Sequence, residues 1–374
     1  VLETRKILRA AAALNGEEIE IPKERYAFEY PGSVQGVIPF DDNKEEQVLT
    51  GIENTYASTG TYGCRISYAG LGPGVHASCC VDTFIDLKPK GKEGTSYFDV
   101  LCSPTLYSGQ EVTAVVEAEA EKNPRFCFFI QYFDENDELA LAYGDQVQIK
   151  KGMNTIRWEV PDTKGHAIYR LGICLLSDVR VEGSIILRTM DWGNAPIRYE
   201  MGRSMEMTPS LTPWTTTTAW LKTFVSSADH FNPDYTVTFS ICHGCPNGVV
   251  TTGTSDWDDY EVSSVITFSQ QDQAGLVARA KGHRQYYAAV FTEGCARIYK
   301  QKNEKRIILA EESFPYKIDN TYKLLLRVEG GRLTFFVDDR EILCAQDEEY
   351  TCGQAGFVVD SGAILGDGFL VRRV

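Results

Sequence analysis

The sequence has no long apolar run and no excess of basic residues. None of its hydrophobic stretches approaches the roughly 20 consecutive apolar residues that a membrane-spanning helix needs, so we expect no such helix. Only 37 lysine and arginine residues stand against 52 aspartate and glutamate residues, which gives a net charge of −15. Because nucleic-acid backbones bind to basic surfaces, this balance excludes nucleic acid as the expected partner.

The motifs of common hydrolases are also missing. There is no G-x-S-x-G and no H-E-x-x-H sequence, and the five histidines show no spacing typical of a metal site. A glycosidase needs two carboxylates flanking the scissile bond, but no predicted strand carries the E-x-D-x-x-E or E-x-D-x-E pattern of concanavalin-like hydrolases. The glycine-rich residues 70–74 do not match the G-x-G-x-x-G pattern of nucleotide-binding loops either. We therefore expect no catalytic residues within this chain.

The eleven cysteines are scattered along the chain rather than grouped. Several lie inside apolar runs, as Cys127 and Cys174 do, where a free thiol behaves as a small buried hydrophobic group. The one C-x-x-C pair, Cys242 and Cys245, has no second pair at zinc spacing and no βαβ surroundings, which favours a structural role over metal binding or redox chemistry. No signal peptide begins the sequence. These features predict a cytoplasmic protein with few or no disulfides.

At 374 residues the chain is long enough for two or three domains. Residues 1–55 read as a separate N-terminal segment. Apolar residues at helical spacing and an alanine run predict a helix that ends near Asn15 and Gly16. The proline- and glycine-containing residues 22–55 predict a linker that either wraps a domain in an ordered way or is flexible.

Residues 56–200 predict one antiparallel β-sandwich, because short apolar or alternating runs recur and no helical period interrupts them. The clearest predicted strands are residues 110–118, 125–133 and 152–160. The sequences IYRLGI at residues 168–173 and GSIILR at residues 183–188 resemble the last strands of galactose-binding-like jelly rolls. Those domains are common carbohydrate-binding modules, so the resemblance implies a binding role.

Residues 201–374 predict a second antiparallel sandwich, because β-branched and aromatic runs alternate with glycine, asparagine and aspartate. The order of several short motifs resembles the laminin-G/concanavalin-A-like jelly roll found in lectins and in accessory domains of glycan enzymes. The motifs are DWDDYEV at 256–262, AGLVAR at 274–279, YYAAV at 286–290, LTFFVD at 333–338 and GFVV at 356–359. The expected fold class is therefore all-β, with two antiparallel β-sandwich (jelly-roll) domains behind a short helical and extended N-terminal segment.

The N-terminal sequences TRKIL at residues 4–8 and GEEIEIP at residues 16–22 resemble the segment that follows the helical catalytic domain in some large bacterial ADP-ribosylglycohydrolase-family proteins. Two β-sandwich domains follow the helical domain in such proteins. The chain starts at Val1 rather than Met, which is compatible with a fragment of a larger protein as well as with a chain that starts there. The resemblance implies that its partner is a helical catalytic domain outside this chain. The acidic residues that bind two magnesium ions in that family belong to the helical domain.

Sugar binding needs aromatic faces that stack on pyranose rings, with planar polar groups beside them. One predicted hairpin of the second domain offers Arg279, His283, Tyr286 and Tyr287, and Trp257 is expected on the preceding strand. Because neighbouring residues of a strand point to opposite faces, one of the two tyrosines is expected in the core and one free to stack. Arg279 follows an apolar run, so we expect it to have a carboxylate partner or a ligand. A core position for Trp257 is the alternative.

Jelly rolls of both types often hold a structural calcium ion near their outer strands, so the resemblance makes calcium a candidate cofactor. Asp191 and Asp367 lie near the ends of the two domains, where such families often place a ligand carboxylate.

The expected function is a non-catalytic accessory region of an ADP-ribosylglycohydrolase-like protein that binds a glycan or an ADP-ribose-like ligand. Two alternatives remain open. One is an enzyme of the keto-disaccharide hydrolase type, since related concanavalin-like domains have that activity. The other is a structural scaffold that docks on the helical catalytic domain or a second subunit.

The scattered cysteines generate a first prediction. Titration of the denatured, unreduced protein with a thiol reagent should count about eleven thiols, because eleven cysteines are expected to be unpaired. The melting temperature should therefore barely change when a reductant is added. A count of three or fewer would overturn the cytoplasmic assignment.

Overall fold

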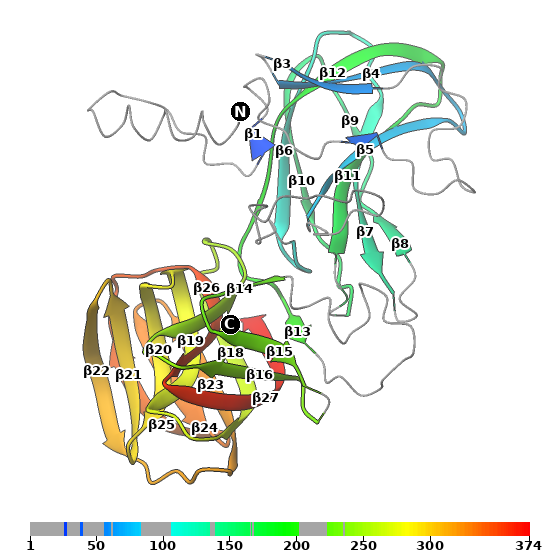
Figure 1. The fold of residues 1–374 in the computed structure, drawn as a ribbon. Coiled ribbons are helices and arrows are strands. Elements are labelled where there is room, and N and C mark those ends of the chain that lie inside the picture. The colour runs from blue at the N-terminus through cyan, green and yellow to red at the C-terminus, as the bar shows by residue number, and fades with distance from the viewer. Residues whose placement is uncertain are drawn as a thin grey trace.

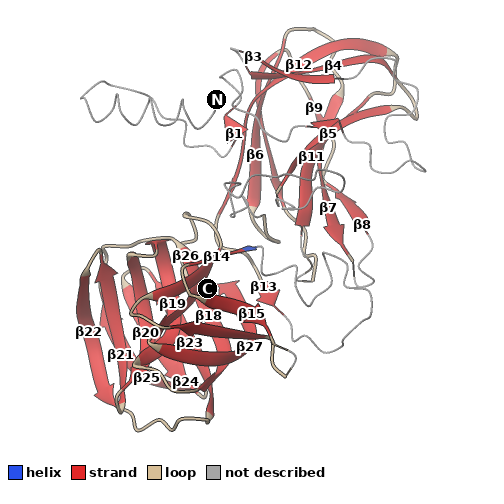
Figure 2. Ribbon diagram, in the orientation of Figure 1, coloured by secondary structure: helices blue, strands red, loops and turns tan. Residues whose placement is uncertain are grey.

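β-Strands dominate the part of the chain that the computed structural model describes (Figure 2), and no α-helix occurs in that part. No described helix is therefore long and apolar enough to cross a membrane. The predicted N-terminal helix lies outside the described residues. These are residues 26–27, 38–39, 56–60, 63–83, 106–134, 139–164, 166, 168–201, 223–234 and 236–374.

The first sandwich consists of two antiparallel sheets (Figure 1). One sheet has the strand order β10 (Gly152–Glu159), β6 (Glu111–Ala118), β12 (Val181–Gly193), β4 (Gly63–Leu71) and β3 (Tyr56–Gly60), and β1 (Tyr26–Ala27) also pairs with β12. The other has the order β2 (Ile38–Pro39), β5 (His76–Asp82), β11 (Ile168–Leu176), β7 (Arg125–Phe133) and β8 (Leu139–Tyr143), and β9 (Val147–Gln148) pairs with β7. The predicted strands at residues 110–118, 125–133 and 152–160 correspond to β6, β7 and β10.

The alternation of apolar side chains places the core between these sheets. Along β6, every second residue is buried, and Val112 and Val116 contact the core from one sheet. Phe126 and Phe128 of β7 contact it from the other. The opposite face of β7 is buried too, because Phe129 packs there in a small outer cluster of cysteines. This second buried face explains why β7 is apolar at nearly every position.

The outer cluster contains Cys80, Cys127 and Cys174 as free thiols. All ten cysteines that the structure describes are free. Burial raises the pKa of the Cys64 thiol, on the inner face, to about 11. Since the thiolate is the reactive form, such a thiol is inert near neutral pH.

The strands β1 and β2 show how the N-terminal segment continues into the first sandwich. Tyr26 pairs with Met190 in one sheet, and Ile38 pairs with Cys80 in the other. The described residues of the predicted linker therefore pair with both sheets of the first sandwich.

The second sandwich also consists of two antiparallel sheets. One has the order β15 (His230–Pro233), β16 (Phe239–His243), β27 (Gly362–Arg373), β18 (Tyr260–Phe268), β23 (Thr321–Glu329), β24 (Arg332–Val337) and β25 (Arg340–Gln346), and β13 (Tyr199–Met201) pairs with β27. The other has the order β14 (Phe224–Ser226), β17 (Gly248–Thr252), β26 (Gln354–Asp360), β19 (Gln273–Gly282), β20 (Gln285–Thr292), β21 (Cys295–Lys302) and β22 (Lys305–Ser313). The predicted fold class of two antiparallel sandwiches is confirmed.

An aromatic cluster joins the two sandwiches. Tyr107, which precedes β6, packs its ring against Tyr199 and Trp257, with ring centroids 4.7 and 5.2 Å away. Its hydroxyl group lies 2.9 Å from that of Thr252. Tyr107 thus belongs to the same buried cluster as the core of the second sandwich. The two sandwiches are therefore joined by a packed apolar contact as well as by the chain.

Strand β13 strengthens this junction. Tyr199 pairs with Val371 of β27. Arg373, at the end of β27, donates hydrogen bonds from Nε and Nη2 to the Ala195 carbonyl and from Nη2 to the Gly109 carbonyl, at 2.7–3.0 Å. The boundary predicted between residues 200 and 201 falls inside β13, so the sheet of the second sandwich begins before it.

This junction generates a second prediction. A fragment of residues 195–374 should be more stable than a fragment of residues 214–374, by about 3 kcal/mol, because it keeps β13 and the buried Tyr199 ring. Urea denaturation of both fragments, followed by circular dichroism, measures the difference. Equal stabilities would show that β13 contributes little to the second sandwich.

Candidate functional site

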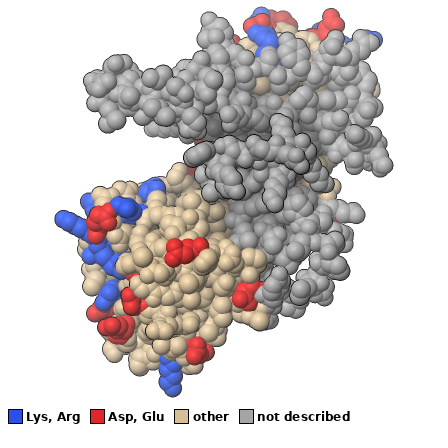
Figure 3. Space-filling view, in the orientation of Figure 1, with Lys and Arg blue, Asp and Glu red and all other residues tan. Residues whose placement is uncertain are grey.

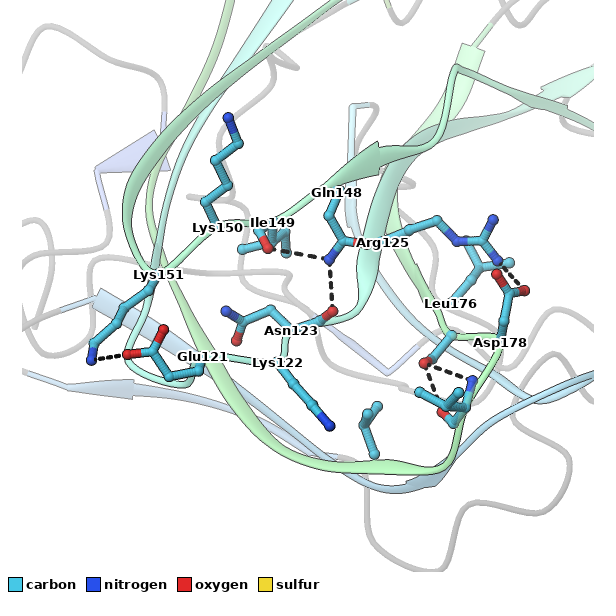
Figure 4. Close-up of a pocket in the computed structure, with 13 residues that line it drawn as sticks. Glu121, Lys122, Asn123, Arg125, Gln148, Ile149, Lys150, Lys151, Leu176 and Asp178 are labelled. Atoms are coloured by element: carbon cyan, nitrogen blue, oxygen red, sulfur yellow. Dashed lines mark hydrogen bonds and ion pairs between the residues drawn. The ribbon is translucent and has the colours of Figure 1, made fainter.

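A pocket of about 600 Å³ opens at one end of the first sandwich (Figure 4). It lies between the loops that join β6 to β7, β9 to β10 and β11 to β12. Strand β12 starts at this pocket and ends at the junction with the second sandwich, so the pocket is at the end of the domain away from the junction (Figure 1). The lining residues are Glu121, Lys122, Asn123, Arg125, Gln148, Ile149, Lys150, Lys151, Leu176, Ser177, Asp178, Val179 and Val181.

Side-chain hydrogen bonds to the backbone hold two of these loops together. The Gln148 amide donates from Nε2 to the carbonyl oxygens of Asn123 at 2.8 Å and Ile149 at 3.2 Å. The Asn154 side chain accepts from the Lys150 backbone N–H at 2.9 Å and donates to the Lys150 carbonyl at 2.8 Å. These bonds fix the loops without a ligand, so the pocket is preformed.

Two ion pairs flank the pocket. Lys151 Nζ lies 2.6 Å from Glu121 Oε1, and Arg125 Nη2 lies 2.5 Å from Asp178 Oδ1. Basic and acidic side chains also lie close together at the top of the first sandwich in Figure 3. Exposed pairs of this kind contribute little to stability, but they neutralise both carboxylates of the lining.

Lys122 and Lys150 remain without an ion pair among the described residues. The lining contains four cations and two carboxylates, which gives a net charge of 4 − 2 = +2. Figure 4 shows Lys122 extending toward the side of the pocket where Asp178 lies, whereas Lys150 extends away from the other labelled side chains. The lining is thus positively charged although the whole chain has a net charge of −15. A positively charged lining favours an anionic ligand.

The remaining lining is partly apolar and partly hydrogen-bonding. Leu176, Val179 and Val181 provide apolar surface, and Val179 is 61% exposed. Asn123 Oδ1 is buried and has no hydrogen-bond partner among the described residues. None of the lining residues is aromatic. The lining therefore offers charged groups and no aromatic face for ring stacking.

The aromatic residues predicted to bind sugar lie elsewhere and are buried. Trp257, Tyr286 and Tyr287 are all 0% exposed, so the expectation that one of the two tyrosines is free to stack is not met. The Tyr287 hydroxyl donates to Asp347, which also accepts from Lys300. Burial alone would raise the pKa of the Asp347 carboxyl, but the hydrogen bonds from Lys300 and Tyr287 outweigh it and hold that pKa below its usual range.

Arg279 has a carboxylate partner, which is one of the two alternatives that the sequence predicts, and each nitrogen of its guanidinium has an acceptor. Nη2 lies 2.8 Å from Asp259 Oδ1, and Nε donates to the Asp258 carbonyl at 3.0 Å. Nη1 donates to the carbonyl oxygens of Gly330 at 2.6 Å and Tyr350 at 3.3 Å. The side chain is 1% exposed. Arg279 therefore connects three loops of the second sandwich, and the structure leaves it no donor that faces solvent.

The backbone of Arg279 forms a bulge in β19. Its φ is 48°, a left-handed conformation that is uncommon for a residue with a side chain. Its N–H donates to the Tyr260 hydroxyl at 2.6 Å. The register with β20 shifts between Ala278 and Gly282. A bulge bends a strand, so the β19–β20 hairpin bends at this point.

The sheet that contains this hairpin coils back on itself. Arg306 of β22 and Asp360 of β26 form an ion pair at 2.8 Å, although β21, β20 and β19 lie between their strands. In a flat sheet these strands would be about 19 Å apart. The Arg306 guanidinium also lies 4.5 Å from the centroid of the Tyr299 ring. The coil therefore brings the two parts of the sheet together over its outer face.

Side chains fill the outer face inside this coil and form a small second core. Its members are Val249, Val277, Ala280, Tyr286, Ala288, Val290, Tyr299 and Val358. Burial raises the pKa of Tyr286 to about 12 and lowers the pKa of His283. The His283 carbonyl accepts a hydrogen bond from Asn247 Nδ2 at 2.9 Å. Of the five predicted sugar-binding residues, only His283 is partly exposed, so this geometry does not favour a glycan groove here.

The structure gives no further support to the predicted calcium ligands. Asp367 Oδ1 accepts from the Thr238 hydroxyl at 3.2 Å, and Asp191 lies in β12 of the first sandwich. Within the described residues, no group of three or more histidine, cysteine, aspartate or glutamate side chains is placed to hold a metal ion. Calcium binding at either residue stays a prediction.

No protein-family profile matches the sequence, and no curated protein matches it either. Solved structures with similarity include carbohydrate-binding module CBM66 from Bacillus subtilis, at 18% identity over 39% of this chain and 92% of that one, with a TM-score of 0.36. Domain 4 of AbnA, a GH43 extracellular arabinanase from Geobacillus stearothermophilus in complex with arabinotriose, is 8% identical over 40% of this chain and 82% of that one, with a TM-score of 0.29. The Caenorhabditis elegans galectin LEC-6 is 14% identical over 30% and 82%, with a TM-score of 0.25. Similarities of this size do not determine what the chain binds.

The buried guanidinium generates a third prediction. Replacing Arg279→Met keeps the apolar stem but leaves three carbonyl groups without their donor, so unfolding should require about 3 kcal/mol less free energy. Arg284→Met in the same hairpin is the matched control, because Arg284 is 67% exposed and its ion pair is with the exposed Glu304. The control should change stability by no more than about 0.5 kcal/mol. Urea denaturation compares both variants with the parent, and equal effects would contradict this role for Arg279.

Proposed function

We propose that the chain is a non-catalytic carbohydrate-binding region, and that the pocket at the end of the first sandwich binds a sugar carrying a carboxylate or phosphate group. The observation that carries this proposal is the excess positive charge of the lining, in which Lys122 has no ion pair with a described residue. A pocket of this volume is within the range for small-molecule sites.

The walls of the pocket support a sugar as the ligand class. The sequences at residues 168–173 and 183–188, which resemble galactose-binding-like jelly rolls, lie in β11 and β12. These two strands are joined by the loop that forms one side of the pocket. Leu176 and Val181 supply apolar contact for a sugar ring. The Ser177 hydroxyl donates to the Val179 carbonyl at 2.6 Å and keeps acceptor capacity for a sugar hydroxyl. The resemblance and the pocket thus fall on the same part of the fold.

ADP-ribose is a specific ligand within this proposal, because it joins sugar hydroxyls to two phosphate groups. A helical ADP-ribosylglycohydrolase-like catalytic domain is the corresponding partner. Both extensions rest on the N-terminal resemblance at residues 4–8 and 16–22. Association with that domain without any sugar or nucleotide binding would favour the scaffold function instead.

The exposure and the ion pairs of the two carboxylates in the pocket favour binding over hydrolysis as its function. A general acid needs surroundings that keep it protonated, such as an apolar site or a second carboxylate. Glu121 and Asp178 are instead 79% and 82% exposed, and each faces a cation. Neither is placed to protonate a leaving group.

A fourth prediction tests the proposed function. Isothermal titration with galacturonic acid, galactose and ADP-ribose should show binding of at least one acidic ligand and weaker binding of galactose. Lys122→Gln should weaken acidic-ligand binding about tenfold, which corresponds to about 1.4 kcal/mol. Raising the salt concentration should weaken it too, since the contact is electrostatic.

Lys305→Gln is the matched control, because Lys305 is an exposed lysine of β22 in the second sandwich. The Lys305→Gln variant should bind the acidic ligand with the same affinity as the parent protein. The proposal fails if neither acidic ligand binds, or if Lys122→Gln and Lys305→Gln bind the acidic ligand equally well.

A further inference from the structure

A second hollow of about 330 Å³ lies next to the pocket, across the turn between β11 and β12. One side is the β4–β5 turn, and the other is the start of β12. The lining residues are Ala69, Gly70, Gly72, Pro73, Val75, Arg180 and Glu182. The glycine-rich residues 70–74, which match no nucleotide-binding motif, therefore form a wall of this hollow.

The two hollows share one stretch of backbone. Val179 and Val181 line the first pocket, whereas Arg180 and Glu182 line the second hollow. This is the alternation expected of an extended chain, in which successive side chains point to opposite sides. Residues 179–182 are thus a ridge with one hollow on each side, and the exposed Val179 gives it an apolar surface.

The second hollow is preformed by its turn. Gly70 and Gly74 have φ values of 70° and 74°, which glycine adopts without strain. The Val75 N–H donates to the Gly72 carbonyl at 2.9 Å and closes the turn. The wall therefore keeps its shape without a ligand.

Arg180 supplies the second hollow with a cation. It is exposed and has no ion pair or side-chain hydrogen bond with a described residue. A guanidinium can bind a carboxylate through two parallel hydrogen bonds. Among the described residues, each hollow thus has a cation without an ion pair, Lys122 in one and Arg180 in the other. Glu182 also lines the second hollow, so the lining there has no net charge and its attraction for an acidic group comes from the guanidinium of Arg180 alone.

We infer that the two hollows are consecutive subsites for an acidic oligosaccharide, with one acidic unit in each hollow and a sugar ring over the ridge at Val179. This inference rests on the proposed function and adds the size of the ligand to it. A single acidic sugar uses only the first pocket. A longer acidic oligosaccharide also contacts Arg180. Because its units are covalently linked, this second contact does not cost the translational and rotational entropy of binding a second molecule.

Titration calorimetry with galacturonic acid and with its linear trimer tests the inference. The trimer should bind the parent protein at least tenfold more tightly than the monomer. Arg180→Gln should remove most of this gain and leave monomer binding unchanged. Arg340→Gln, at the exposed first residue of β25, is the matched control and should keep the full gain.

The outcomes separate this inference from the proposed function. If the monomer binds and the trimer binds no more tightly, the second subsite is refuted and the anionic-sugar pocket stands. The same holds if the trimer binds more tightly but Arg180→Gln keeps the gain. If neither compound binds and ADP-ribose does not bind either, the proposed function fails and the inference fails with it.

Discussion

The guanidinium of Arg279 holds the second sandwich in its observed shape. It donates to three backbone carbonyls and a carboxylate from loops that are far apart in the sequence. Its own backbone forms the bulge that bends the β19–β20 hairpin. The bent hairpin belongs to the sheet that coils back on itself. The ion pair of Arg306 in β22 with Asp360 in β26 joins the two sides of that coil. The side chain of one buried arginine thus holds three loops together, and its backbone bends the strand that leads into the filled outer face.

Because that face is filled, the proposed binding site lies on the other domain. Its charge acts locally: at physiological ionic strength the Debye length is about 8 Å, so a pocket with net charge +2 attracts an anion despite the acidic remainder of the chain. The overall negative charge still acts on association, since it opposes the approach of a polyanion at low salt. Affinity and association rate should therefore respond differently to salt.

Local patterns in the sequence predicted the strands well, because alternation and apolar runs are properties of neighbouring residues. Residues 125–133 form β7 as expected, and Arg279 has its carboxylate partner. The alternation rule failed for Tyr286 and Tyr287, since it assumes that one face of a strand is exposed and the coil buries both. The pocket was missed because Lys122, Lys150 and Val179 come from three loops, and only the fold brings them together. The one local signal was the pair Lys150 and Lys151 in an acidic chain.

The length of β12 sets the distance between the pocket and the second sandwich. This strand carries a wall of the pocket at Val181 and reaches the junction at Gly193. Thirteen residues of extended chain cover about 40 Å. The aromatic cluster around Tyr107 packs the end of the first sandwich opposite the pocket against the second sandwich. Strand β12 therefore keeps the pocket and the second sandwich at a fixed separation. A molecule held at the pocket is displayed well clear of the second sandwich, whose outer surfaces stay available for a different neighbour at the same time.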